Sequence, residues 1–187
     1  MRVLVTGIDG QVGGELMELG ILGAELIGTN RTELDLSDSQ SIETAYSSVS
    51  PNLIINCAAY TNVDLAEDEP ESANAINKQG PKLLAKLCAK DNIPFIHIST
   101  DYVFDGTKTS SYKPEDLAQP LGVYGASKAN GEQEIRDNCS QYIILRTAWV
   151  FSARGHNFVK TMLRIGKTAE RLNVVGDQIG RPTSAKD

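Results

Sequence analysis

Five short apolar runs, separated by longer stretches of mixed polarity, are the feature that most limits how this chain can fold. They cover residues 3–6, 25–28, 53–56, 95–99 and 142–146. Near-continuous hydrophobicity of this kind is typical of strands that are covered on both faces. The stretches at about residues 11–19, 39–48, 71–90 and 124–138 have the pattern of helices. Because strand and helix alternate, the sequence predicts an α/β fold with a doubly wound parallel sheet and helices on both faces.

The composition of the chain excludes several classes of protein. Its 187 residues, 41% hydrophobic and 22% charged, are typical of a soluble globular domain. A net charge of −6 argues against a broad nucleic-acid surface. No stretch approaches the roughly 20 apolar residues of a membrane span, and the amino terminus has the pattern of a first strand rather than of a signal peptide. We therefore expect a cytoplasmic protein that binds neither nucleic acid nor membrane.

Neither the cysteines nor the histidines have the spacing of a metal or redox centre. Cys57, Cys88 and Cys139 are widely separated and form no Cys-x-x-Cys pair, so we expect free thiols. His97 lies inside an apolar run and His156 begins a helix-like stretch, and we expect structural roles for both. No Gly-x-Ser-x-Gly or Walker sequence appears, so hydrolase and phosphoryl-transfer functions lack their usual support.

Three glycines follow the first predicted strand at the mouth of a helix. They are Gly7, Gly10 and Gly13. In a Rossmann-type dinucleotide site the first glycine allows a tight turn, the second lets the backbone approach a pyrophosphate, and the third lets the helix pack closely. The helix amino terminus adds free amides and partial positive charge. A plain tight turn is the alternative, but the strand before and the helix after favour nucleotide binding.

The end of the second predicted strand is where such a site selects its cofactor. NAD-selecting sites usually offer an acidic side chain to the ribose 2′-hydroxyl here, whereas an arginine accommodates a 2′-phosphate. Arg31 therefore favours NADP(H) over NAD(H), with a solvated surface arginine as the alternative. Asp35 and Leu36 follow, and we expect them beside the adenine.

A tyrosine and a lysine in the fourth helix-like stretch have the spacing of a proton-donor pair. Tyr124 and Lys128 stand four residues apart, which places phenol and ammonium on one helix face. A nearby cation favours phenolate and lowers the pKa of a tyrosine from about 10. Ser99, Thr100 and Asp101 lie at the carboxyl end of a strand, the edge where parallel sheets place ligands. A hydroxyl there can bond a substrate carbonyl, with strand termination as the alternative role.

Taken together, these motifs resemble a known family of enzymes. Thr-Gly-x-x-Gly-x-x-Gly, Asn-x-Ala-Ala, Ser-Thr-Asp-Tyr-Val-Phe-Asp-Gly and Tyr-x-x-x-Lys resemble the extended short-chain dehydrogenase/reductases. Gly-Gln-Val-Gly, Val-Tyr-Gly-Ala-Ser-Lys and Asp-Gln-Ile-Gly-Arg-Pro-Thr-Ser narrow the resemblance to the dTDP-4-dehydrorhamnose reductase family. The resemblance implies reduction of the 4-keto group of dTDP-4-dehydro-L-rhamnose by NADPH or NADH, giving dTDP-L-rhamnose. Tyr124 would donate a proton, Thr100 would hold the carbonyl oxygen, and Lys128 would bind the nicotinamide ribose and tune Tyr124.

The resemblance also completes the set of predicted site residues. The predicted catalytic residues are Thr100, Tyr124 and Lys128. The predicted cofactor-binding residues are Gly7, Asp9, Gly10, Gln11, Val12, Gly13, Asn30, Arg31, Asp35, Leu36, Cys57, Ala58, Ala59, Tyr60, Asn77, Ser99, Tyr124, Lys128 and Trp149. Relatives also use Asn56 against the cofactor. Some bacterial relatives bind Mg²⁺ through glutamates at a dimer contact, and Glu15 matches one of these; the others are not located, so Mg²⁺ stays open and no metal site is predicted.

The resemblance divides the chain into an NAD(P)-binding Rossmann domain at residues 1–150 and the beginning of a substrate-binding lobe at residues 151–187. In the second part the sequence predicts a helix at 156–167 and a strand at 172–175. Family members continue beyond this point, so we expect a truncated chain. The expected partner is a small-molecule nucleotide sugar, and a homodimer stays open. Two other functions also stay open: an epimerase or dehydratase that recycles NAD, and a regulatory subunit resembling the β subunit of methionine adenosyltransferase.

Overall fold

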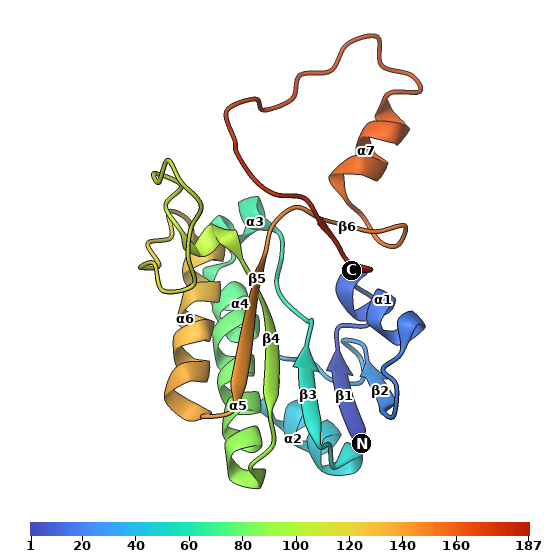
Figure 1. Cartoon of the computed structure of the whole chain (residues 1–187), viewed down its shortest axis with the longest axis vertical. Helices are drawn as coiled ribbons and strands as arrows, with labels where there is room; N and C mark the ends of the chain where they lie inside the picture. Colours follow the sequence, from blue (N-terminus) through green and yellow to red (C-terminus); the bar gives the residue numbers. More distant parts are fainter.

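The computed structural model describes residues 1–187 and contains a parallel sheet of five strands (Figure 1). The strands are β1 (Arg2–Thr6), β2 (Glu25–Thr29), β3 (Leu53–Asn56), β4 (Phe95–Thr100) and β5 (Tyr142–Thr147). Their spatial order is β2-β1-β3-β4-β5. The chain moves outward from β1 to β2 and then crosses back to β3, so the strand order reverses between β1 and β3. Ligands of open α/β sheets bind at such a switch point, beyond the carboxyl ends of the strands.

The helices connect these strands and agree with the predicted pattern at most positions. They are α1 (Gln11–Leu19), α2 (Ser39–Val49), α3 (Val63–Asp68), α4 (Pro70–Asn74), α5 (Gly80–Asp91), α6 (Val123–Asn138) and α7 (Phe158–Ile165). A single turn of 3-10 helix, η2 (Asp101–Val103), follows β4. The short helix α3 was not predicted; Asn62 caps it by accepting a hydrogen bond from the Leu65 amide at 3.2 Å. No helix combines the length and the apolar character needed to traverse a bilayer.

The single helix predicted at 71–90 is interrupted by a π-helical turn, η1 (Ala75–Gln79). Pro81 has no amide hydrogen to donate back to the carbonyl of Asn77, so regular α-helical bonding cannot continue through this point. Gly131 of α6 lies against that same carbonyl, and a Cβ added there would stand 2.0 Å from the Asn77 oxygen. The widened turn and the glycine together let α6 pack closely on η1.

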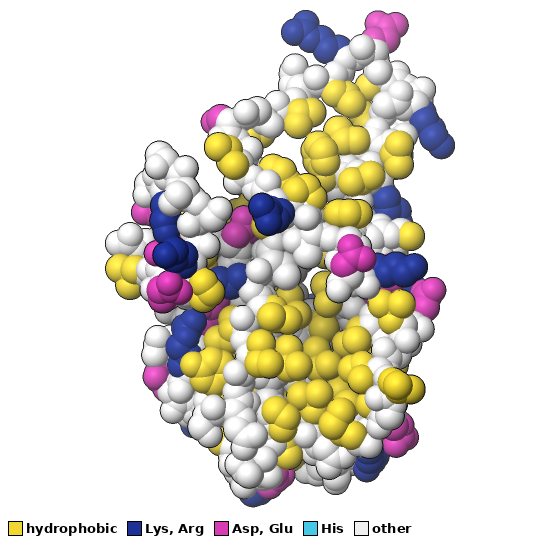
Figure 2. All heavy atoms as spheres, in the orientation of Figure 1, with side chains coloured by type: hydrophobic (Ala, Val, Ile, Leu, Met, Phe, Trp, Pro, Cys, Tyr) yellow, Lys and Arg dark blue, Asp and Glu magenta, His cyan; other side chains and the backbone are white.

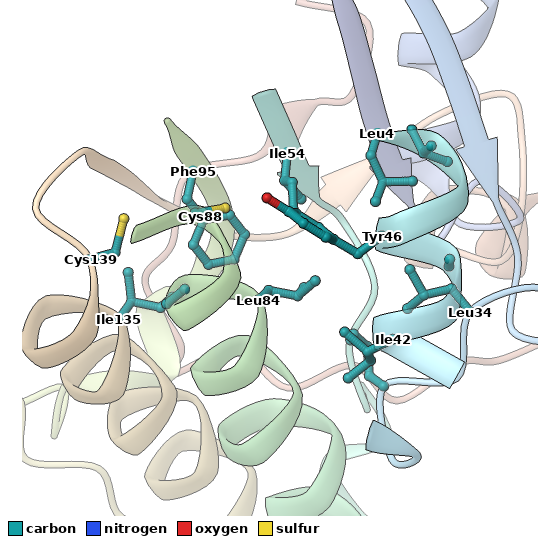
Figure 3. Close-up of a cluster of buried hydrophobic side chains, with 14 residues drawn as sticks. Leu4, Leu34, Ile42, Tyr46, Ile54, Leu84, Cys88, Phe95, Ile135 and Cys139 are labelled. Carbon is teal, nitrogen blue, oxygen red and sulfur yellow. The ribbon is translucent and has the colours of Figure 1, made fainter. Parts of the chain in front are cut away.

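The main core fills the space between one face of the sheet and α2, α5 and α6 (Figure 3). Strand side chains such as Leu4, Ile54 and Phe95 meet Ile42 of α2 and Leu84 of α5, and each of these five is at most 1% exposed. Burying an aliphatic or aromatic side chain of this size contributes about 1.5–3 kcal/mol. This layer therefore contributes substantially to the stability of the fold.

The other face of the sheet is covered over only part of its width. A smaller cluster, with Val3, Val5 and Ile55 at its centre, packs against residues of α1. Further along, Ile143 and Leu145 of β5 remain 54% and 46% exposed. Figure 2 shows hydrophobic side chains gathered into one broad surface on the viewed face of the sheet. Helices thus lie on both faces, as predicted, but the second layer is narrower than the first.

The carboxyl-terminal part differs from the prediction. The predicted helix at 156–167 is α7 (Phe158–Ile165), which Asn157 caps by accepting from the Lys160 amide at 3.0 Å. The predicted strand at 172–175 is wrong: these residues are irregular, because no neighbouring strand takes up their backbone hydrogen bonds. Instead, β6 (Val150–Phe151) pairs in parallel with β7 (Thr183–Ser184), which returns the end of the chain to the rim of the sheet.

Candidate active site

A cleft of about 900 Å³ lies beyond the carboxyl ends of the strands. Its walls come from the loop after β1, the segments that follow β2, β3 and β4, and the first turns of α6. The predicted site residues that line it are Gly7, Asp9, Gly10, Gln11, Val12, Asn30, Arg31, Asp35, Leu36, Cys57, Ala58, Ala59, Tyr60, Ser99, Thr100, Tyr124, Lys128 and Trp149. Two predicted residues, Gly13 and Asn77, lie outside this lining.

The glycine turn after β1 brings backbone groups close together at one end of the cleft. Gly7 has a φ of +72°, and a Cβ added there would stand 2.7 Å from the backbone of Ala58. Gly13 is a packing position, because a Cβ there would stand 2.5 Å from the Gly7 oxygen. Helix α1 begins with Gly10 as its N-cap and has no side-chain cap. The amides of its first turn therefore stay available to an anion such as a phosphate group.

The predicted cofactor-selecting residues lie along the cleft beyond β2. Arg31 Nε lies 3.3 Å from Asp35 Oδ2, and the Arg31 side chain is 76% exposed. Hydrogen bonding from Ser37 lowers the pKa of Asp35, with Arg31 contributing a smaller part. The Arg31 guanidinium donates to Asp35 through Nε alone, so most of its N–H donors remain free for a ligand.

Thr100 and Tyr124 meet at the other end of the cleft. Thr100 is the last residue of β4, and Tyr124 is in the first turn of α6. Their approach depends on Gly125, where a Cβ would stand 2.2 Å from the carbonyl oxygen of Tyr102. The rings of Tyr102 and Tyr124 pack edge to face at 5.6 Å. The glycine thus lets α6 press against η2 and presents the phenol beside the end of β4.

The direction of the Tyr124 pKa shift differs from the prediction that Lys128 would lower it. Burial raises the pKa of Tyr124 above its ordinary value; hydrogen bonding with Thr100 offsets part of the rise, and the charge of Asp101 adds to it. Lys128 does not counter this effect, because its Nζ is 3.0 Å from His97 Nε2 and donates to the Ile98 carbonyl at 2.7 Å. Burial lowers the pKa of Lys128 to about 8. Tyr124 is therefore a protonated phenol at neutral pH.

A buried row of polar side chains lies below Lys128. The Thr6 hydroxyl donates to Asn56 Oδ1, Asn56 Nδ2 is 2.9 Å from His97 Nδ1, and His97 Nε2 faces Lys128. All four residues are at most 1% exposed. The resemblance implied that Asn56 contacts the cofactor, but its side chain is occupied inside this row. His97 has the structural role that was predicted for it.

Asn77 and Ser99 are occupied by protein partners. Asn77 Oδ1 accepts from the Tyr60 amide at 2.9 Å, and its Nδ2 donates to the Tyr60 carbonyl at 3.0 Å. Asn77 thus holds the segment after β3 in place from outside the cleft. The Ser99 hydroxyl donates to the buried carboxylate of Glu132 at 2.7 Å, and Arg146 donates to the same carboxylate. Sequence reasoning missed Glu132, because nothing in the local pattern distinguishes it from an exposed helical glutamate.

The sequence profile of the family described as the RmlD substrate binding domain matches residues 1–187. The chain belongs to this family. It is 45% identical over 188 residues to a dTDP-4-dehydrorhamnose reductase of Aggregatibacter actinomycetemcomitans, covering 100% of this chain and 64% of that protein. It is 44% identical to another from Sinorhizobium fredii, of which it covers 63%. The chain therefore spans somewhat less than two thirds of the length of these relatives.

A solved structure of the RmlD family has the same fold. The dTDP-4-dehydrorhamnose reductase of Bacillus anthracis, in complex with NADP, superposes with a TM-score of 0.94 at 38% identity. The match covers 98% of this chain and 66% of that one. The parallel sheet and its helices are thus those of an RmlD-family protein.

The last segment of this RmlD-family chain is anchored on α1. Gln11 Nε2 donates to the Val150 carbonyl at 3.1 Å, and Asn157 Nδ2 donates to Gln11 Oε1 at 2.8 Å. Glu15, the residue that matches a metal ligand of some relatives, is buried and accepts from the Ser152 hydroxyl at 2.5 Å. Trp149, with a φ of +48°, lies at the mouth of the cleft, where Gly180 packs against its ring.

Proposed function

We propose that this chain is the dinucleotide-binding and catalytic part of an NADPH-dependent reductase. The substrate proposed is dTDP-4-dehydro-L-rhamnose, whose 4-keto group is reduced to give dTDP-L-rhamnose. The observation that carries the proposal is the meeting of Thr100 and a protonated Tyr124 in the same cleft that begins at the glycine turn. The names of the relatives and the NADP complex of one of them support it.

The residues of the cleft fit a nicotinamide dinucleotide. Gly7 and Gly10 leave backbone space beside the uncapped start of α1, which suits a pyrophosphate. Arg31 offers an exposed guanidinium where a 2′-phosphate is expected, and this favours NADPH over NADH. Lys128 lines the cleft at the other end, where it would contact the nicotinamide ribose. A bound NADPH supplies the hydride for the reduction.

Tyr124 would supply the proton. A phenol whose pKa is raised by burial keeps its proton at neutral pH and releases it to an oxygen that gains negative charge. The Thr100 hydroxyl would orient that oxygen beside the phenol. General acid catalysis of this kind contributes about 10²- to 10⁴-fold to the rate. Thr100 is buried at the end of β4, and Tyr124 packs edge to face on Tyr102, so the fold positions both groups.

The two parts of the chain would have different tasks. We propose that residues 1–150 bind the dinucleotide and that residues 151–187 contribute to a lobe that contacts the sugar nucleotide. Trp149 at the mouth of the cleft supports this division, because the segment that packs on its ring belongs to the second part. A small-molecule nucleotide sugar is accordingly the partner that we propose.

The test is a titration followed by an assay with the same protein. NADPH and NADH are titrated separately by calorimetry, and dTDP-4-dehydrorhamnose is then added while the absorbance of the reduced cofactor is followed. We expect tighter binding of NADPH and a loss of absorbance that is stoichiometric with the sugar. Binding without net oxidation would instead point to an epimerase or dehydratase. Absence of binding to either dinucleotide would contradict the proposal altogether.

A further inference from the structure

The buried row below Lys128 crosses three neighbouring strands at one register. Thr6 on β1 is paired with Asn56 on β3, and Asn56 is paired with His97 on β4. The row ends at Lys128 of α6, whose Nζ lies 3.0 Å from His97 Nε2. Each member is at most 1% exposed, and Lys128 alone borders the cleft. Every hydrogen in the row must therefore be shared between protein groups.

The orientation of the Asn56 amide sets the directions of the other hydrogen bonds in the row. The Ala58 amide donates to Asn56 Oδ1 at 3.3 Å, and the Thr6 hydroxyl donates to the same oxygen. In this orientation the Asn56 amide nitrogen faces His97 Nδ1 at 2.9 Å, and Nδ1 then accepts. A neutral imidazole that accepts at one nitrogen carries its hydrogen on the other. His97 therefore donates from Nε2, and the Lys128 nitrogen must accept.

Only a neutral lysine amine can accept a hydrogen bond. An ammonium has three donors and no lone pair. A neutral amine at this position accepts from His97 and still donates to the Ile98 carbonyl, 2.7 Å away. The hydrogen-bond directions set by Ala58 and Asn56 thus fit Lys128 without its charge.

We infer that His97 and Asn56 are positioning residues that couple the charge of Lys128 to the tautomer of His97. When Nζ takes up a proton, it becomes a donor toward Nε2, and the single ring hydrogen of His97 relocates to Nδ1. The Asn56 amide then turns over to present its oxygen to Nδ1. The net change is one proton gained at Nζ, while His97 stays neutral throughout.

The electrostatic surroundings make both charge states of Lys128 accessible. Burial lowers the pKa of Lys128 to about 8, and the charge of Glu132 on the same helix opposes this effect. Burial raises the pKa of the nearby Cys57 thiol to about 12, so that thiol stays neutral in this range. Glu132 is itself paired with Arg146 and Arg136. Burial, and then the charge of Lys128, hold the pKa of His97 well below its ordinary value, so the ring changes tautomer rather than charge.

The coupling extends to the backbone that lines the cleft. When the Asn56 amide turns over, the Ala58 amide loses its acceptor at Oδ1 and keeps only the Thr6 hydroxyl at 3.3 Å. Ala58 is the residue against which Gly7 packs. The charge at one end of the cleft is thus linked to the glycine turn at the other. The importance of this link for turnover rests on the proposed function, whereas the coupling itself does not.

Nitrogen-15 NMR of the two imidazole rings tests the coupling in the whole chain without dinucleotide or sugar. Two-bond nitrogen–proton correlations identify which ring nitrogen carries the hydrogen. As pH falls from about 9.5 to about 6.5, across the Lys128 pKa of about 8, the His97 hydrogen is expected to move from Nε2 to Nδ1. His156, the second of the two histidines, is exposed and serves as an internal reference.

Two variants identify the groups responsible. In Lys128→Met the ring should remain in the Nε2-protonated form at every pH. In Asn56→Asp the new carboxylate should hold the hydrogen on Nδ1 throughout. A wild-type tautomer that does not change with pH would overturn the inference, and so would an unchanged switch in Lys128→Met. The wild-type titration decides even where a variant does not fold, and its outcome is independent of whether the chain reduces a keto sugar.

Discussion

Arg146 of β5 donates two hydrogen bonds, of 2.9 and 2.6 Å, to the fully buried carboxylate of Glu132 on α6. Arg136 donates to the same carboxylate at 2.7 Å, as does Ser99 of β4. Burial alone would raise the pKa of Glu132, but these hydrogen bonds outweigh burial and lower it. The carboxylate therefore ties α6, and with it Tyr124 and Lys128, to the sheet.

Removing Arg146 should destabilise the fold, because the buried Glu132 carboxylate loses one of its two cationic partners. Arg146→Met leaves Glu132 with Arg136 and Ser99 only, and we expect the free energy of unfolding in urea to fall by about 3–5 kcal/mol at neutral pH. The matched control is Arg154→Met, which breaks an exposed pair with Glu18 and should change stability little. Equal losses in the free energy of unfolding for the two variants would show that the buried pair stabilises the fold no more than the exposed pair.

The same pair predicts how stability depends on acid. The folded-state pKa of Glu132 is lowered, so its contribution is complete above the unfolded pKa of about 4.3 and is lost as pH falls through the folded value. In Glu132→Gln this part of the acid dependence should be missing. Urea unfolding of both proteins between about pH 6 and about pH 3 measures it. A constant difference between them across this range would contradict the assignment.

Gly131 should tolerate no side chain. Gly131→Ala places a Cβ 2.0 Å from the Asn77 oxygen, so α6 must move away from η1. We expect a loss of about 1–3 kcal/mol in the free energy of unfolding, together with weaker dinucleotide binding because Asn77 holds Tyr60. The control is Gly176→Ala, whose added Cβ meets no atom within 4 Å. Thermal melting and calorimetric titration of both variants distinguish a packing defect from a general effect of losing glycine.

Tyr124→Phe should separate chemistry from binding. Loss of the phenolic hydroxyl removes the proposed proton donor, and turnover is expected to fall about 10²- to 10⁴-fold while NADPH affinity stays within a few fold. The control is Tyr102→Phe. The ring centroids of Tyr102 and Tyr124 are 5.6 Å apart, and loss of the Tyr102 hydroxyl should leave most activity intact. Turnover that survives in Tyr124→Phe would remove this residue from the mechanism.

Arg31 should determine the choice between the two dinucleotides. Arg31→Ala removes the exposed guanidinium proposed to meet the 2′-phosphate, so NADPH affinity should fall about tenfold or more while NADH affinity changes little. Lys82→Ala, a basic residue of α5 that pairs with Glu134, is a control for the loss of one positive charge. Equal losses of affinity for NADPH and NADH in Arg31→Ala would mean that Arg31 does not bind the 2′-phosphate.

The sheet could be predicted from the sequence because its strands carry their own signal. The runs of β1, β3 and β4 are largely buried by the strands and helices beside them, so local hydrophobicity and final position agree there. The run of β5 pairs with β4 although Ile143 and Leu145 stay partly exposed. The strand predicted at 172–175 has the same kind of residues but lacks a partner, and pairing is not a local property. The π-helical turn likewise depends on Pro81 and on the distant Gly131 together.

The positions of site residues could be predicted where a sequence motif fixes their spacing. Their protonation states and hydrogen-bond partners could not be predicted, because these depend on residues from other strands. The four-residue spacing of Tyr124 and Lys128 placed both on the cleft side of α6. Their protonation was not predictable, because it depends on burial and on His97, which comes from another strand. The side chain of Asn56 is likewise taken up by Thr6 and His97, which follows only from the register of three strands.

The short β6–β7 pair has a mechanical consequence. It closes residues 150–184 into a loop held at both ends, and Gln11 fastens that loop to α1 through Val150 and Asn157. The first turn of α1 is also where a phosphate is proposed to bind. A dinucleotide bound at that turn would therefore contact the same helix end that holds the loop carrying α7.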